Sequence, residues 1–122
     1  MKKTARTDTL FKHWKLSTDI DNVLWLSLDR EGKSTNSLSL EVLSELATII
    51  DGVETNAPSG LVLQSAKPGS FIVGADVREF DDYDDPAMAS DGIDQVHRLF
   101  NRIEALPFPT VVTIDGMCLG GG

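Results

Sequence analysis

Two helical patterns separate three short β-prone runs along this chain, and this alternation constrains the fold more than any other feature. The β-prone runs are Val23–Leu28, residues 61–65 and residues 110–114. Apolar residues at helical spacing predict one helix from about residue 39 to residue 51 and a second that begins at Asp85 and Pro86. Strands that alternate with helices are typical of layered α/β folds, so the sequence predicts an α/β protein.

The first β-prone run belongs to a predicted hairpin over residues 14–29. Turn-forming residues at 19–22 precede the run. Leu24, Leu26 and Leu28 alternate along it and would share one face. The hairpin is therefore expected to present a row of leucines to the core.

The first helix has recognisable end signals. Ser39 is the expected N-cap, and Glu41 lies in the first turn, where the helix dipole favours a negative charge. Gly52 is the expected stop. These signals predict a helix that ends at about residue 51.

The rest of the chain gives a simple domain organisation. Residues 1–10 are expected to form a polar, frayed tail, and residues 11–122 an incomplete domain. The runs at 61–65 and 110–114 are expected to be buried strands, and an extended loop is expected over residues 66–75.

Charge and cysteine usage exclude several classes of protein. Acidic residues outnumber basic ones by 19 to 11, which gives a net charge of −8. A chain this acidic is not expected to bind nucleic acid or an anionic membrane surface. The single cysteine, Cys118, favours a reducing compartment. No apolar run resembles a signal peptide or a transmembrane segment, so a soluble, cytoplasmic chain is expected.

Residues 69–76 form the first candidate site. Gly69 and Gly74 are spaced as in some phosphate-binding loops, but Ala75 and Asp76 stand where a Walker A loop requires Lys and Ser or Thr. That interpretation is rejected. Gly74 allows a backbone turn that other residues resist, which would aim the Ala75 amide outward. An ordinary strand-to-helix turn is the alternative interpretation.

Three consecutive glycines form the second candidate site. Gly120, Gly121 and Gly122 follow the last predicted strand. Such a run lets backbone amides approach a ligand closely. Two amides from separate loops would make an oxyanion hole. A flexible or artificial chain end is the alternative interpretation.

The other reactive residues predict no site. Residues 81–85 carry four aspartates but lack the spacing of a calcium loop, so a solvated loop is expected and no metal site is predicted. His13 and His97 have no partner at a recognisable spacing and are assigned no role. Cys118 lies in an apolar context and is expected to be a small buried hydrophobic residue rather than a nucleophile.

Longer segments carry a resemblance to a known family. Residues 71–80 are close to F-x-x-G-A-D-[IV]-x-E-[FM], and residues 109–122 look like P-x-[IV]-A-x-[IV]-x-G-x-x-x-G-G-G. Residues 22–30 resemble the opening strand of the same family, and residues 36–39 look like its N-x-L-s helix entry. Because these segments occur in the family's order along the whole chain, the sequence resembles the crotonase (enoyl-CoA hydratase/isomerase) superfamily.

A finer likeness lies at residues 32–38. They resemble the G-K-S-x-N-[ST]-L form typical of the α-subunit of bacterial fatty-acid oxidation complexes, in which a hydratase domain is fused to a 3-hydroxyacyl-CoA dehydrogenase. This resemblance implies an acyl-CoA substrate and no further cofactor in this region, with NAD confined to a downstream dehydrogenase domain. It also implies a homo-oligomer or a hetero-complex with a thiolase subunit.

The resemblance implies a fold and a set of site residues. The fold would be the first half of a crotonase-type ββα spiral, truncated before the catalytic-glutamate helix. Of the two catalytic glutamates, the first would lie on the helix just after the glycine run and the second later still, both beyond Gly122. The backbone N–H groups of Ala75 and Gly121 would be the catalytic oxyanion donors. The implied substrate-binding residues are Val73, Gly74, Asp76, Arg78 and Gly120. Among these, Arg78 would approach the phosphates of CoA or, alternatively, pair with Asp82.

The function implied for the parent protein is enoyl-CoA hydratase of fatty-acid β-oxidation, with residues 1–122 alone inactive. An enoyl-CoA isomerase of the same superfamily and a non-catalytic acyl-CoA-binding or interaction module are the alternatives. A spiral cut midway exposes the apolar face that its next turn would cover. The isolated chain is therefore expected to be marginally stable or to self-associate.

Overall fold

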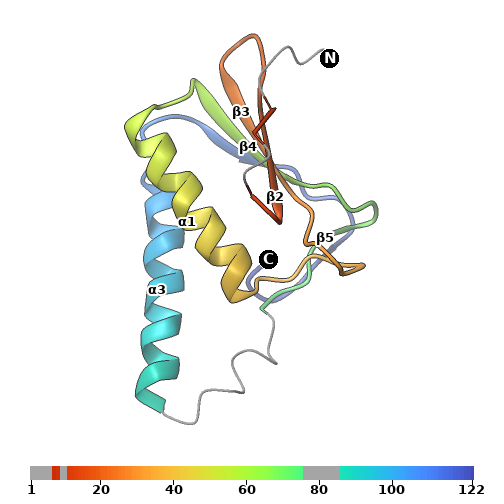
Figure 1. Ribbon diagram of the computed structural model, residues 1–122, viewed down its shortest axis with the longest axis vertical. Coiled ribbons are helices and arrows are strands. Elements are labelled where there is room, and N and C mark those ends of the chain that lie inside the picture. The colour runs from red at the N-terminus through yellow and green to blue at the C-terminus, as the bar shows by residue number, and fades with distance from the viewer. Residues whose placement is uncertain (1–6, 9–10, 76–85) are drawn as a thin grey trace.

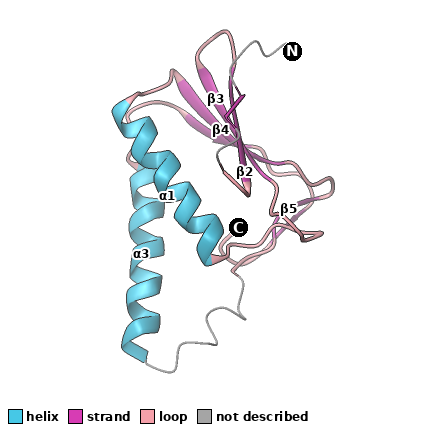
Figure 2. Cartoon of the chain, viewed as in Figure 1, coloured by secondary structure: helices cyan, strands magenta, loops and turns pink. Residues whose placement is uncertain are grey.

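The computed structural model describes residues 7–8, 11–75 and 86–122. Two helices, α1 (Leu40–Thr55) and α3 (Pro86–Glu104), run side by side next to a five-stranded sheet (Figure 1). In sheet order, the five strands are β1 (Thr7–Asp8), β2 (Trp14–Thr18), β3 (Val23–Leu28), β4 (Gly60–Ser65) and β6 (Thr110–Val112). The separate pair is β5 (Ser70–Ile72) and β7 (Met117–Cys118). Figure 2 shows both helices on one side of the strands, which confirms the predicted α/β class.

The predicted hairpin is confirmed, and one side chain organises its turn. β2 and β3 pair antiparallel along their whole length. Asp19 Oδ1 accepts the backbone amides of Asp21 and Val23 at 2.9 and 3.0 Å. Asp19 Oδ2 accepts the indole N–H of Trp25 at 3.0 Å. An aspartate that binds backbone amides in this way reproduces a turn with its own side chain.

Helix α1 starts where the sequence predicts and ends later. The Ser39 side chain accepts the amide of Val42 at 3.1 Å, which confirms Ser39 as the N-cap. The expected stop at Gly52 is wrong, since the helix continues past it and ends with the Asn56 amide donating to the Gly52 carbonyl at 2.9 Å. Val53 in this last turn is only 5% exposed. The burial of Val53 offsets the roughly 1 kcal/mol by which a glycine such as Gly52 destabilises the interior of a helix.

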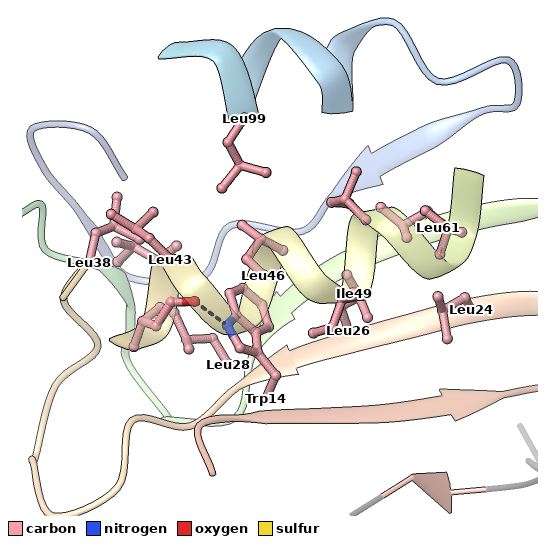
Figure 3. Close-up of a cluster of buried hydrophobic side chains, with 14 of the residues drawn as sticks. Trp14, Leu24, Leu26, Leu28, Leu38, Leu43, Leu46, Ile49, Leu61 and Leu99 are labelled. Atoms are coloured by element: carbon pink, nitrogen blue, oxygen red, sulfur yellow. Dashed lines mark hydrogen bonds between the residues drawn. The ribbon is translucent and has the colours of Figure 1, made fainter. Parts of the chain in front are cut away.

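The core lies between β3 and α1 (Figure 3). Buried and half-buried residues alternate strictly along β3, and the buried ones are the predicted row of leucines. Trp14 of β2 is 1% exposed and donates its indole N–H to the Val42 carbonyl at 3.0 Å. Leu99 is the α3 side chain buried within the core, and Val96, Phe100 and Ile103 of the same helix pack against it. The helix side of the cluster consists of Val42, Leu43, Leu46, Ile49, Ile50 and Val53.

The edges of the sheet differ from the sequence expectations. β1 pairs antiparallel with β2, although residues 1–10 were expected to be frayed. At the other edge, β6 covers only Thr110–Val112, and Val111 and Val112 are 52% and 51% exposed. The expectation of a buried strand over residues 110–114 is therefore wrong. Within the described residues β6 pairs with β4 alone, and a strand at the rim of a sheet is covered on fewer sides.

Parallel pairing brings three loops to one end of the sheet. β3, β4 and β6 are neighbours and pair parallel. Parallel strands have their carboxyl ends at the same edge, because the connection between them crosses back over the sheet. The loops that follow these ends are residues 29–39, 66–75 and 113–122. Both glycine segments singled out in the sequence lie in this group of loops. In the described part of the chain, neither helix is long and apolar enough to cross a bilayer.

Candidate active site

The two glycine segments lie side by side. The first contains β5 and the second contains β7, and these strands pair parallel with Ser70 opposite Met117 and Ile72 opposite Cys118. Beyond the pairing, the Leu119 amide donates to the Ile72 carbonyl at 3.0 Å. The sequence did not predict either strand, because each is only two or three residues long. Their pairing brings residues 69–75 against residues 116–122.

Glycine is required where the two segments touch. Gly74 has φ +102, and a Cβ placed on it would lie 3.3 Å from the Leu119 carbonyl oxygen and 3.6 Å from the Gly120 Cα. A Cβ on Gly122 would lie 2.3 Å from the Ile72 carbonyl oxygen, which is a severe overlap with backbone. Only residues without a Cβ allow two backbones to approach this closely. Gly74 therefore adopts a backbone conformation that other residues resist, as the sequence analysis expects.

Ala75 and Gly121 follow directly on the contacting residues Gly74 and Gly120. Gly121 lies within a turn that the Gly122 amide closes on the Leu119 carbonyl at 2.9 Å. Ala75 faces Leu38 as an isolated parallel bridge, with the Leu38 amide donating to the Gly74 carbonyl at 2.8 Å. Across the described ranges, neither the Ala75 nor the Gly121 amide donates to a backbone carbonyl. Among the described residues, two N–H groups without a backbone partner thus come from adjacent loops.

The structure places three of the five implied substrate-binding residues in these loops. Val73 and Gly74 precede Ala75, and Gly120 precedes Gly121. Asp76 and Arg78 lie outside the described residues, as does the acidic run at 81–85, including Asp82 and Asp85, where the second helix was expected to begin.

Asn36 is a site residue that sequence reasoning missed. Its side chain is fully buried and connects four chain segments by hydrogen bonds. Asn36 is the first residue of the N-x-L-s motif, but that motif by itself predicts only the start of a helix. Local patterns do not reveal the partners of such a residue, because those partners lie up to 35 positions away.

A charged cluster fixes the neighbouring loop after β3. Asp29 accepts the ammonium of Lys67 at 2.8 Å and that of Lys15 at 2.9 Å. These two lysines, Lys67 first, lower the pKa of Asp29 below its ordinary value, while partial burial works against them. Lys67 also donates to the Lys33 carbonyl at 2.8 Å. The cluster therefore ties the end of β3 to the loop that follows β4.

The two histidines and the cysteine show different degrees of burial. His13 is 4% exposed, its Nε2 lies 2.5 Å from Glu41 Oε1, and its Nδ1 accepts the Glu31 amide at 3.0 Å. These contacts hold β2 against α1, and the His13 hydrogen bond lowers the pKa of Glu41. His97 is exposed, and Cys118 is half-buried within the hydrophobic cluster. Among the described side chains, no group of three or more His, Cys, Asp or Glu residues gathers as a metal site would.

An apolar cavity adjoins the glycine turn. Its volume is about 320 Å³. Gly121 and Gly122 form part of its wall, and most of the remaining wall is hydrophobic side chain. The hydrophobic side chains that line it include Leu38, Phe71, Ile72, Phe100 and Ile114. An apolar group held at the Gly121 amide would therefore face apolar surface.

Comparison with known sequences identifies relatives of the chain. The sequence profile of the Enoyl-CoA hydratase/isomerase family matches residues 23–122. The fatty acid oxidation complex subunit alpha of Aliivibrio fischeri is 36% identical over 106 residues, covering 85% of this chain and 15% of its own. The same subunit of Shewanella oneidensis is 36% identical over 112 residues, which cover 91% of this chain and 16% of the relative. The chain thus spans about one sixth of the length of these curated relatives.

Solved structures agree with the sequence comparison. The enoyl-CoA hydratase of Bacillus anthracis superimposes with a TM-score of 0.80 at 29% identity, over 90% of this chain and 42% of that protein. An enoyl-CoA hydratase/carnithine racemase of Magnetospirillum magneticum gives a TM-score of 0.79 at 25% identity, over 94% of this chain and 42% of that protein. The fold is therefore that of the first part of a crotonase-type domain. Together with the profile match over residues 23–122, this similarity shows that the chain belongs to the enoyl-CoA hydratase/isomerase family.

Proposed function

We propose that the chain is the part of an enoyl-CoA hydratase that binds the thioester oxygen during fatty-acid β-oxidation. The observation that carries the proposal is the contact between residues 74 and 120, which joins two loops whose Ala75 and Gly121 amides have no backbone partner among the described residues. Family membership supplies the substrate class, a CoA thioester. Two backbone amides from separate loops are the arrangement that stabilises a developing oxyanion.

The proposed chemistry requires such donors. When water adds to C3 of a trans-2-enoyl-CoA, the electrons of the double bond move onto the thioester oxygen, which becomes an enolate. The Ala75 and Gly121 amides would bind that oxygen more strongly as it gains charge, so they lower the barrier and not merely the ground state. Protonation of the α-carbon then completes hydration. In this proposal a later segment of the parent protein supplies the two glutamates that move these protons.

The remaining substrate contacts follow from the same placement. The apolar cavity beside Gly121 would receive the acyl chain. Val73, Gly74 and Gly120 would contact the thioester through their backbone. Asp76 and Arg78, which lie outside the described residues, stay in the proposal as substrate-binding residues that the family resemblance implies, with Arg78 toward the CoA phosphates. CoA is part of the substrate in this proposal, and a downstream dehydrogenase domain that uses NAD stays a prediction.

An enoyl-CoA isomerase is the second candidate, since the matching family includes both activities. Its reaction also passes through an enolate and uses the same two amides, but it moves a proton between carbons and adds no water. We further propose that the parent protein works in the cytoplasm, within a complex containing a thiolase subunit. The names of the relatives, subunits of a fatty acid oxidation complex, support this assembly.

The test is the hydration of crotonyl-CoA by the full-length protein that contains this chain, with 3-enoyl-CoA isomerisation measured in parallel. Ala75→Pro removes the amide donor. We expect it to lower kcat by about 10²–10³-fold, the cost of losing one oxyanion donor. Ala75→Ser keeps the N–H group and is the matched control, expected to retain most activity. Residues 1–122 alone should show no turnover.

Each outcome has a distinct meaning. Full activity of a folded Ala75→Pro variant would reject the oxyanion assignment. Isomerisation without hydration would select the second candidate. Acyl-CoA binding without either reaction in the full-length protein would select a non-catalytic binding module.

A further inference from the structure

Asn36 is a fully buried polar residue outside the reacting loops. It lies in the loop between β3 and α1 and has an exposed fraction of 0%. Its Nδ2 donates to the Leu28 carbonyl and the Ser65 hydroxyl, each at 2.9 Å, and to the Phe71 carbonyl at 3.3 Å. The first two acceptors are the last residues of β3 and β4, and the third lies in β5. The amide group therefore joins the ends of two sheet strands to the strand that leads to Ala75.

Two other polar atoms of Asn36 also have hydrogen-bond partners. Its Oδ1 accepts the Arg30 amide at 2.9 Å, and its backbone carbonyl accepts the Val73 amide at 2.9 Å. A buried amide with every atom engaged is held in one orientation, because any rotation would leave a polar group unpaired. Asn36 is thus a rigid reference point, held in place by its hydrogen bonds to the last residues of β3 and β4.

The segment that ends at Ala75 is attached to this reference point twice. Its attachments are the Phe71 carbonyl, through the side chain, and the Val73 amide, through the backbone. The next contact along the segment is the Leu38 amide on the Gly74 carbonyl. These three bonds control the direction in which the chain enters Ala75. The Ala75 amide has no backbone partner of its own within the described residues, so its direction depends on them.

We propose that Asn36 is a positioning residue that aims the Ala75 amide at the thioester oxygen. This inference rests on the proposed function. Asn36 would not touch the substrate, and it would act by holding Phe71 and Val73 in register with the sheet. A displacement of about 1 Å in a catalytic group can cost about 10²-fold in rate. Loss of the Asn36 amide should therefore lower kcat and leave CoA binding largely intact.

The experiment uses the full-length protein with three variants. Asn36→Asp keeps the size and the Oδ1 acceptor but replaces the N–H donor with an oxygen that repels the Phe71 carbonyl. Asn36→Ser is the milder change and retains one donor. Val53→Ala is the control, because Val53 is buried near the opposite end of α1 from Asn36. Chemical unfolding gives the free energy of unfolding of each variant, so that a change in activity can be compared with a change in stability.

Two readouts separate positioning from general stability. The first is kcat against KM for crotonyl-CoA. The second is the infrared stretch of the bound thioester carbonyl, read with butyryl-CoA that carries ¹³C at that carbon and cannot be hydrated. Hydrogen bonds from an oxyanion hole polarise the carbonyl and lower its frequency, so this readout reports the aim of the donors directly. We expect the wild-type shift to shrink in Asn36→Ser and further in Asn36→Asp. We also expect kcat to fall about 10–100-fold while KM changes little.

The outcomes distinguish this inference from the proposed function. A wild-type shift that both Asn36 variants retain, with kcat equal to that of Val53→Ala, overturns the positioning role and leaves the proposed function in place. Absence of a shift in the wild-type protein overturns both. Failure of both Asn36 variants to fold assigns Asn36 to structure alone and also rejects the inference.

Discussion

Asp29 shows how one carboxylate links segments far apart in sequence. It follows β3 and accepts the ammonium of Lys67, which lies 38 positions later and is 13% exposed. A lysine this buried has lost most of its water, so its ion pair is screened less than a surface pair. Because Asp29 is itself one-third exposed, the pair is expected to contribute only about 0.5–1 kcal/mol.

The pH dependence of this contribution follows from the lowered pKa of Asp29. The carboxyl has an ordinary pKa of 3.8 when the chain is unfolded and a lower pKa when folded. Its stabilisation is therefore fully present above about pH 4 and is lost as the pH falls through the folded-state pKa. We predict that Asp29→Asn lowers the free energy of unfolding by about 0.5–1 kcal/mol at pH 7 and that this loss shrinks as the pH falls below about 4. Urea unfolding of Asp29→Asn, Lys67→Met and the double variant at several pH values measures the coupling, and a coupling that does not weaken toward acid pH would contradict the prediction.

At the scale of elements, the pairing of β5 with β7 depends on two glycines more than on the strands themselves. Gly116 has φ +85, and a Cβ there would lie 2.0 Å from the Gly69 carbonyl oxygen. The Met117 amide donates to that same carbonyl at 3.3 Å. An added methyl group could fit only if the two backbones moved apart, which would break the pairing that brings Ala75 and Gly121 together.

We predict that Gly116→Ala destabilises the fold by more than 3 kcal/mol, a loss in the range reserved for severe steric or backbone conflicts. Gly52→Ala is the matched control, because Gly52 lies inside α1 with open space around it. That change should stabilise the fold by about 0.5–1 kcal/mol, the usual advantage of alanine over glycine in a helix. Urea midpoints of the two variants test both signs, and a tolerated Gly116→Ala would show that the two loops are not held together.

At the scale of the whole molecule, apolar side chains are unevenly distributed over the surface. Val111, Val112, Ile114, Met117 and Leu119 are each more than half exposed, at 51–58%. They all lie in the last part of the chain, and Val111 and Val112 belong to β6, which has no neighbour on its outer side among the described strands. A sheet edge with exposed branched side chains is a template for pairing with another chain.

We therefore predict that residues 1–122 self-associate in solution, as the sequence analysis expected. Sedimentation velocity over a range of concentrations measures this. Val112→Lys places a charge on the edge strand and should shift the distribution toward the monomer. Ile20→Lys is the control, since Ile20 is 71% exposed in the hairpin turn and lies away from that edge. A monomer at all concentrations would contradict the prediction.

The sequence by itself determined the local elements and the family. The two-residue period of β3 specified which leucines are buried, and the helical stripe of α1 specified its core face. Ser39 specified where the helix begins. Motifs in residues 71–80 and 109–122 specified the family. Each of these depends on neighbours within a few positions, so periodicity and local hydrogen bonding are enough to reveal it.

Only the tertiary structure decided the rest. Exposure of β6 depends on its place at the sheet edge, and the passage of α1 through Gly52 depends on the burial of Val53. The joining of Gly74 to Gly120 and the four segments held by Asn36 depend on partners tens of residues away. Sequence patterns report the preference of each segment, whereas packing and long-range hydrogen bonds select which preferences are satisfied together. The candidate site is formed by those long-range contacts.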